Sequence, residues 1–151
     1  EEAIRSLLIE AFLRPAEADL VDALRWQGDL AVSLVAVDQG RIVGHAALSY
    51  LRSPKRALAL APLAVIPGMQ GRGTGAALVR EALAAARGRE AAIIFVLGDP
   101  AYYGRFGFST DAAQLFPSVY SGEHFMGLWL GPARVPAAPV IYAEAFGALG
   151  A

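Results

Sequence analysis

A glycine-rich stretch between an apolar run and an amphipathic segment constrains this chain more than any other part of its sequence. Three glycines stand at alternate positions in it, Gly71, Gly73 and Gly75. The run before it, 58–66, is apolar enough for a buried strand, and the segment after it, 76–87, has its apolar residues at helical spacing. Glycines let the backbone approach a ligand closely, and a helix N-terminus offers unpaired N–H groups with a partial positive charge. The stretch therefore predicts an anion site, most often one for phosphate.

The residues in and around the glycine stretch allow two interpretations of its role. A tight turn that binds nothing needs only the glycines. A dinucleotide-binding fold is supported by Gly71, Gly73 and the acidic Asp99 near the end of the next apolar run. Against that fold, Ala76 stands in place of the third fingerprint glycine, and residues 67–70 separate the strand from Gly71. A P-loop ATPase is excluded because no Gly-Lys-Ser/Thr follows the stretch.

The composition of this 151-residue chain is that of one globular domain, with 56% hydrophobic and 18% charged residues. A net charge of −1 gives no electrostatic reason to expect a nucleic acid partner. The absence of cysteine excludes disulfides, thiolate metal sites and cysteine nucleophiles. The two histidines, His45 and His124, lie far apart in the sequence, so we expect no metal site. No apolar run is long enough to cross a bilayer, so we expect no membrane partner and a cytoplasmic location.

Hydrophobic periodicity and turn residues predict a single α/β domain. Gly40 suits a hairpin turn between two strands, and Pro62 predicts a bulge or local splay in the strand that contains it. Helices are predicted over 1–13, 16–25 and 76–87, with a short one over 102–105. Strands are predicted over 30–37, 42–51, 58–66, 91–97, 124–130 and 140–142.

Two motifs in the right order connect the chain to a known family. The stretch Gln70-Gly71-Arg72-Gly73-Thr74-Gly75 fits Q/R-x-x-G-x-G/A, and about thirty residues later Tyr103 stands four residues before Gly107-Phe108. Both resemble the hallmarks of the GNAT superfamily of N-acetyltransferases. The residues at 97–100 and at 140–146 resemble the sequences found there in one bacterial branch of predicted acetyltransferases. The resemblance covers nearly the whole chain, 1–151, although the superfamily's first strand would precede Glu1.

The resemblance implies a mixed, mostly antiparallel sheet, with splayed central strands and helices flanking it. It also implies that acetyl-CoA is the cosubstrate and that no metal takes part. The pantetheine arm would pair with the backbone of the bulged strand, at Leu63, Ala64 and Val65. The pyrophosphate would bind the glycine loop, at Gln70, Gly71, Arg72, Gly73, Thr74, Gly75 and Ala76.

Tyr103 matches the family's general acid, which protonates the departing thiolate of CoA. The alternative is that Tyr103 only packs in an aromatic cluster with its neighbours. No acidic residue occurs in 58–66, where many members carry their general base. Asp99 is the candidate base, although it would equally cap the turn that follows it, and a water relay is a further option. His45, Glu123 and His124 are other candidates, with a packed, hydrogen-bonded role favoured for His45.

The prediction is an N-acetyltransferase that moves acetyl directly from acetyl-CoA to a primary amine of a small molecule or peptide. Two alternatives stay open, a non-catalytic acyl-CoA-binding sensor and a dinucleotide-binding protein. The sequence does not identify the acceptor, and a monomer and a homodimer are both expected possibilities.

Overall fold

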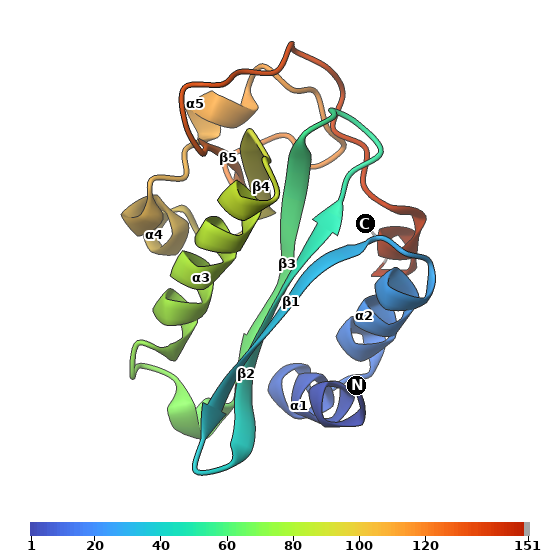
Figure 1. Cartoon of the computed structure of the whole chain (residues 1–151), viewed down its shortest axis with the longest axis vertical. Helices are drawn as coiled ribbons and strands as arrows, with labels where there is room; N and C mark the ends of the chain where they lie inside the picture. Colours follow the sequence, from blue (N-terminus) through green and yellow to red (C-terminus); the bar gives the residue numbers. More distant parts are fainter. Residues whose placement is uncertain (150–151) are drawn as a thin grey trace.

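A five-stranded sheet forms the middle of the molecule, and helices cover both of its faces (Figure 1). The structure is a computed structural model that describes residues 1–149. Its strands are β1 (Leu30–Asp38), β2 (Arg41–Tyr50), β3 (Ala57–Val65), β4 (Ile93–Leu97) and β5 (Phe125–Trp129). Its α-helices are α1 (Glu2–Phe12), α2 (Ala16–Trp26), α3 (Thr74–Gly88), α4 (Pro100–Tyr103) and α5 (Thr110–Ala113). Its 3-10 turns are η1 (Pro67–Met69), η2 (Gly104–Phe106) and η3 (Glu144–Leu149).

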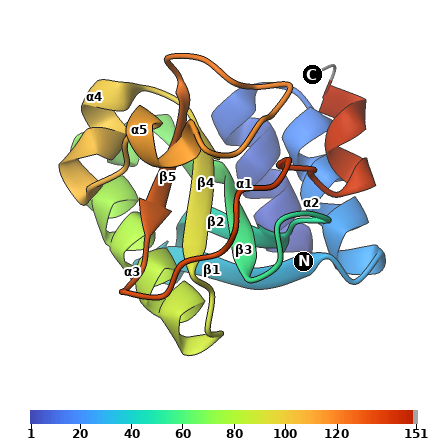
Figure 2. The same ribbon diagram turned by 90° about the horizontal axis from the view of Figure 1, so that it is seen from above.

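The sheet has the order β1-β2-β3-β4-β5 and is mostly antiparallel. Among the described strands only β3 and β4 run parallel to each other, and α3 makes the crossover between them. The mixed, mostly antiparallel sheet expected from the resemblance is thereby confirmed. A dinucleotide-binding fold needs a parallel sheet with helices wound on both faces, so that alternative is wrong. Seen from above, α1 and α2 lie on one side of the sheet, and α3 and α4 on the other (Figure 2).

The predicted apolar face of α3 packs against the sheet. Its buried residues are those whose spacing predicted the helix, namely Leu78, Val79, Ala82, Leu83 and Ala86. They share one core cluster with Ile94 and Val96 of β4, while Ile93 and Phe95 face the opposite side and pack with Phe116. Burial of β4 on both faces explains its continuous apolar run. The position of the glycine loop is therefore set by a helix that the core holds firmly.

The two central strands separate soon after they start to pair. β3 pairs with β4 only over Ala57–Ala59, opposite Ile93–Phe95. Further along, the pairing of β3 with β2 shifts its register between Leu60 and Leu63, so that β3 carries one more residue than β2 in this interval. Pro62 lies within this bulge, which confirms the disruption that its lack of an N–H group predicts. The result is a gap between β3 and β4 that opens toward the glycine loop.

The predicted strand over 140–142 is wrong. The segment makes a single antiparallel bridge, in which Ile141 accepts from the N–H of Arg52 at 2.7 Å and donates to the carbonyl of Ser53 at 3.0 Å. The preceding residue, Val140, donates to the carbonyl of Pro117 at 2.7 Å and not to the segment around Ser53. The ladder therefore does not extend beyond Ile141. The prolines close to this segment carry no N–H group, which limits its pairing to one bridge.

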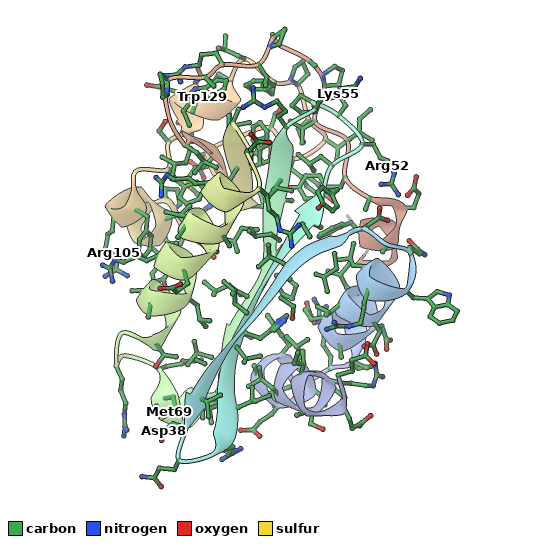
Figure 3. The ribbon with its side chains drawn as sticks, in the orientation of Figure 1. Asp38, Arg52, Lys55, Met69, Arg105 and Trp129 are labelled. Atoms are coloured by element: carbon green, nitrogen blue, oxygen red, sulfur yellow. The ribbon has the colours of Figure 1, made fainter. Side chains whose placement is uncertain are left out.

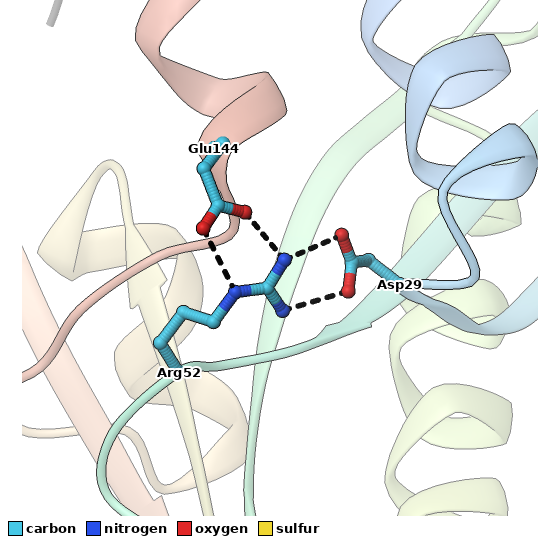
Figure 4. A network of polar contacts seen from close by, with 3 residues as sticks. All are labelled: Asp29, Arg52 and Glu144. Carbon is cyan, nitrogen blue, oxygen red and sulfur yellow. Dashed lines mark hydrogen bonds and ion pairs between the residues drawn. The ribbon is translucent and has the colours of Figure 1, made fainter.

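A network around Arg52 fixes the last described segment onto the rest of the chain (Figure 4). The guanidinium donates to both carboxylate oxygens of Asp29, at 2.7 and 2.9 Å, and also to both oxygens of Glu144 in η3. Asp29 is nearly buried and lies between α2 and β1. These charge-assisted bonds raise the pKa of Arg52, so the guanidinium stays charged throughout. Beneath the network, Phe146 packs in one cluster with Leu20 and Leu24 of α2.

Candidate active site

The glycine loop leads from β3 through η1 into α3. Gly71 and Gly73 have φ angles of +79° and +82°, in the left-handed region that residues with a Cβ rarely adopt. Among the described residues, the N–H groups from Gly71 to Ala76 meet no acceptor of the protein itself. The first helical N–H with an acceptor belongs to Ala77, which donates to Gly73 at 3.0 Å. A run of free N–H groups at the start of a helix is the arrangement that binds phosphate.

A hollow of about 320 Å³ adjoins these N–H groups. It brings the two sequence motifs together, because the chain after β4 returns to the start of α3. The hydroxyl of Tyr102 lies 2.7 Å from the point where a Cβ on Gly75 would stand, so any larger residue there requires the Tyr102 side chain to shift. The hollow is lined by Val65, Met69, Gln70, Gly71, Gly73, Gly75, Ala76, Tyr102 and Arg105.

Tyr102 and Arg105 are site residues that the sequence reasoning did not name. The guanidinium carbon of Arg105 lies 4.7 Å from the ring centroid of Tyr102, and its Nε donates to the carbonyl of Tyr102 at 3.3 Å. Among the predicted residues, Gln70 uses its side-chain amide to donate to the carbonyl of Val65 at 3.1 Å. Gln70 therefore holds the loop against the end of β3. The side chain of Arg72 lies 3.8 Å from the sulfur of Met69.

A larger hollow of about 600 Å³ lies on the other side of α3, against β1. Asp38 and Glu81 both line it, and Asp38 lies beside Met69 near the hairpin turn (Figure 3). Arg72, Gly73 and Thr74 of the glycine loop also line this hollow, but its two carboxylates make it a poorer site for phosphate than the smaller one. The smaller hollow, with Arg105 and the glycine N–H groups, fits an anion better.

The edge of β3 beyond its bulge faces the gap between the central strands. Ile66 donates to Val43 of β2 at 3.0 Å, and alternation along a strand then turns Ala64 toward β2 as well. Leu63 and Val65 turn the other way, toward β4, where no pairing extends beyond Ala59. Of the three predicted backbone positions, the structure thus leaves the backbone of Leu63 and the N–H of Val65 open to an extended ligand, while the carbonyl of Val65 accepts from Gln70.

Tyr103 lies half-buried beside the end of β4. A Cβ on Gly98 would stand 2.5 Å from its ring, so the ring packs directly on the backbone that leaves the strand. It also makes edge contacts with the rings of Tyr102 and Phe108, at centroid distances of 5.0 and 5.8 Å. Burial, with a smaller effect from Tyr102, raises the pKa of Tyr103 to about 12. The predicted aromatic packing is present, and the phenol keeps its proton at neutral pH.

Asp99 caps α4. Its Oδ1 accepts from the N–H of Ala101 at 3.0 Å, which confirms the capping role predicted as an alternative for Asp99. The side chain is exposed and follows directly after Gly98, on which Tyr103 packs. Its role as general base stays a prediction.

His45 is fully buried in β2, and its Nε2 lies 2.8 Å from the hydroxyl of Ser33. The packed, hydrogen-bonded histidine favoured by the sequence is therefore confirmed. Burial lowers the pKa of His45 to about 4, and the positive charge of Arg25 contributes a smaller part of this shift. His124 is exposed, with Nδ1 3.2 Å from the carbonyl of Gly98, and its Nε2 lies 3.5 Å from Glu123.

The buried, neutral His45 makes stability depend on pH. The unfolded chain binds a proton near pH 6.5, whereas the folded protein binds it only near pH 4. Because the unfolded state then binds more protons, we expect stability to fall as the pH drops through this window, by up to about 1.4 kcal/mol per pH unit. Urea unfolding between these pH values measures the slope. His45→Gln should remove it and the exposed His124→Gln should keep it; equal slopes in all three proteins would contradict the assignment.

Residues 1–149 contain no cluster of side chains that could bind a metal ion. No three or more histidine, aspartate or glutamate side chains gather there in a way that could hold one. None of the helices in the same range is both long and apolar enough to span a membrane.

Comparison with known proteins agrees with this geometry. The sequence model of the Acetyltransferase (GNAT) family matches residues 1–108. The chain is 40% identical over 113 residues to the uncharacterized N-acetyltransferase YhbS of Escherichia coli, a match that covers 72% of this chain and 68% of YhbS. The chain belongs to the GNAT family of acetyltransferases.

Two solved structures are similar over almost the whole chain. One is YhbS from Escherichia coli in complex with CoA, with a TM-score of 0.87, 34% identity, and coverage of 97% of this chain and 86% of that one. The other is a GNAT family acetyltransferase from Brucella melitensis in complex with acetyl-CoA, with a TM-score of 0.80, 35% identity, and coverage of 96% and 90%.

Proposed function

We propose that this protein is an N-acetyltransferase that transfers the acetyl group of acetyl-CoA directly to a primary amine. The observation that carries the proposal is the run of free N–H groups from Gly71 to Ala76, which adjoins a hollow bordered by Tyr102, the residue before the second motif. The two similar structures solved with CoA and acetyl-CoA support the same cosubstrate. Each favourable charge at a helix terminus contributes only about 0.3–2 kcal/mol, so several N–H bonds must act together.

The chain supplies groups for each part of the transfer. The pyrophosphate binds the glycine loop, and the pantetheine arm pairs with the open backbone edge of Leu63 and Val65. The acceptor amine attacks the thioester carbonyl, which the N–H of Val65 polarises, so that a C–N bond forms as the C–S bond breaks. Tyr103 gives its proton to the leaving thiolate, and Asp99 is the proposed acceptor of the amine proton. Without cysteine in the chain, a covalent cysteine intermediate is excluded.

A thermal-shift comparison tests the cosubstrate. Acetyl-CoA or CoA at about 100 times its Kd stabilises the folded state by about 2.7 kcal/mol, which raises the Tm by roughly 5–10 °C for a domain of this size. NAD should leave the Tm unchanged because the fold lacks a dinucleotide site. A Tm that responds to NAD and not to CoA would sink the proposal.

A non-catalytic CoA sensor is the second candidate function. The observation that favours it is the absence of any acidic residue along β3, the strand that borders the gap. Release of free CoA thiol in the presence of a panel of primary amines distinguishes the two functions. Binding of CoA without thiol release for any amine supports the sensor, and amine-dependent release supports the enzyme.

A further inference from the structure

A pair of arginines shares one aromatic ring beside the phosphate hollow. The guanidinium carbon of Arg105 lies 5.4 Å from the ring centroid of Phe106, and that of Arg80 lies 5.6 Å from the same centroid. Arg80 belongs to α3 and Arg105 to η2, so the two elements that border the hollow each contribute one cation. Figure 3 shows Arg105 extending outward from the α4 side of the molecule. The aromatic faces restrict both side chains and thereby lower the entropy lost when they bind an anion.

The charge of this pair is not balanced by the protein. Neither Arg80 nor Arg105 forms an ion pair with a carboxylate among residues 1–149. Glu81, which follows Arg80 on α3, lines the larger hollow on the other side of that helix. Elsewhere among residues 1–149, five arginines pair with carboxylates and five others do not. The paired ones are Arg5, Arg14, Arg25, Arg41 and Arg52. Arg80 and Arg105 therefore place unbalanced positive charge beside the hollow where the proposed cosubstrate carries its phosphates.

CoA carries a phosphate separate from its pyrophosphate, which provides an anionic partner for Arg80 and Arg105. The free N–H groups from Gly71 to Ala76 account for the pyrophosphate, and only Arg105 of the two arginines lines their hollow. CoA has one further phosphate, a monoester on the ribose, which carries nearly two negative charges at neutral pH. Guanidinium groups bind such phosphates through short, charge-assisted hydrogen bonds.

We propose that Arg105 and Arg80 bind the 3′-phosphate of CoA and make the protein prefer CoA over dephospho-CoA. The inference rests on the proposed function, because it requires CoA in the glycine loop. It assigns the choice between two cosubstrate forms to Arg80, outside both family motifs, and to Arg105, at a position that the second motif leaves unspecified. The preference weakens as salt is added, because both side chains are exposed and their charges are screened.

Titration calorimetry with CoA and with dephospho-CoA tests the assignment. For the unaltered protein at low salt, we expect CoA to bind about tenfold more tightly than dephospho-CoA. Arg80→Gln should reduce this ratio severalfold and leave the Kd for dephospho-CoA nearly unchanged. Arg105→Gln should also reduce the ratio severalfold, and it should weaken dephospho-CoA binding as well, because Arg105 lines the pyrophosphate hollow. Arg105→Lys, which keeps the charge, should retain part of the preference.

Arg134→Gln is the matched control. Arg134 is also exposed and also lies over an aromatic ring, 4.5 Å from the centroid of Trp129, but it does not line the phosphate hollow. We expect this variant to keep the full preference for CoA. Equal binding of CoA and dephospho-CoA by the unaltered protein, or a preference that survives both glutamine variants at Arg80 and Arg105, overturns the inference and leaves the proposed function intact. Loss of the preference in Arg134→Gln also overturns it, whereas failure to bind either CoA form contradicts the proposed function itself.

Discussion

Replacing Tyr103 with phenylalanine is expected to lower kcat about 10²-fold and to leave the Kd for acetyl-CoA nearly unchanged. In the proposed mechanism the phenol gives a proton to the thiolate, and phenylalanine keeps the ring that packs on Gly98. Burial raises the pKa of Tyr103 to about 12, so the proton is present at neutral pH but is given up reluctantly. For that reason we expect an effect at the lower end of the range for general acids, which spans about 10²–10⁴.

The measurement needs an amine identified by thiol release, with kcat and the Kd for acetyl-CoA determined separately. Tyr50→Phe is a suitable control, because it also removes a phenol, from a residue at the far end of β2. That variant should keep the rate of the unaltered protein. A Tyr103→Phe protein with full activity would show that Tyr103 only packs against its aromatic neighbours. A reduced rate accompanied by an equal loss of acetyl-CoA binding would point to a structural role as well.

A valine at position 75 is expected to weaken acetyl-CoA binding about 10²-fold, with a smaller effect on stability. Its Cβ would stand 2.7 Å from the hydroxyl of Tyr102 and 3.7 Å from a methyl group of Val65. Either Tyr102 moves or the start of α3 shifts, and in both cases the side chain enters the hollow where the pyrophosphate would lie. Several charge-assisted N–H bonds then lose their geometry at once.

Gly68→Val provides the matched control in the same loop. Gly68 has no positive φ angle, and a Cβ there would meet nothing within 4 Å. We therefore expect the control to bind acetyl-CoA almost as the unaltered protein does, in the same calorimetric titration. If both valine variants bind normally, the hollow beside Gly75 is not the pyrophosphate site. If both lose binding equally, the loop responds to any side chain and the specific contact with Tyr102 is not the cause.

Local features of the sequence were enough to predict the parts of the site that depend on the backbone. Alternating glycines before an amphipathic segment predicted the free N–H groups at the start of α3, because those groups follow from helix geometry alone. Pro62 likewise predicted the bulge in β3, since a missing N–H group disturbs any ladder. Tyr103 was different, because only the family resemblance separated it from the other tyrosines.

Arg105 was missed because its importance comes from contacts across the fold. In the sequence it is one of many arginines, and nothing near it indicates a phosphate. Its place at the hollow depends on Tyr102 lying over Gly75, which joins residues from two distant segments. The wrong strand at 140–142 has a related origin, because its pattern suits a strand but no neighbouring strand offers it a full ladder.

The close contact between Tyr102 and Gly75 has an evolutionary consequence. Since a Cβ at position 75 would stand 2.7 Å from the hydroxyl of Tyr102, a larger residue there requires the Tyr102 side chain to move or to be shorter. Relatives with a larger residue at the position of Gly75 should have a smaller one at the position of Tyr102. The two sequence motifs, far apart along the chain, would then vary as a single inherited unit rather than as two.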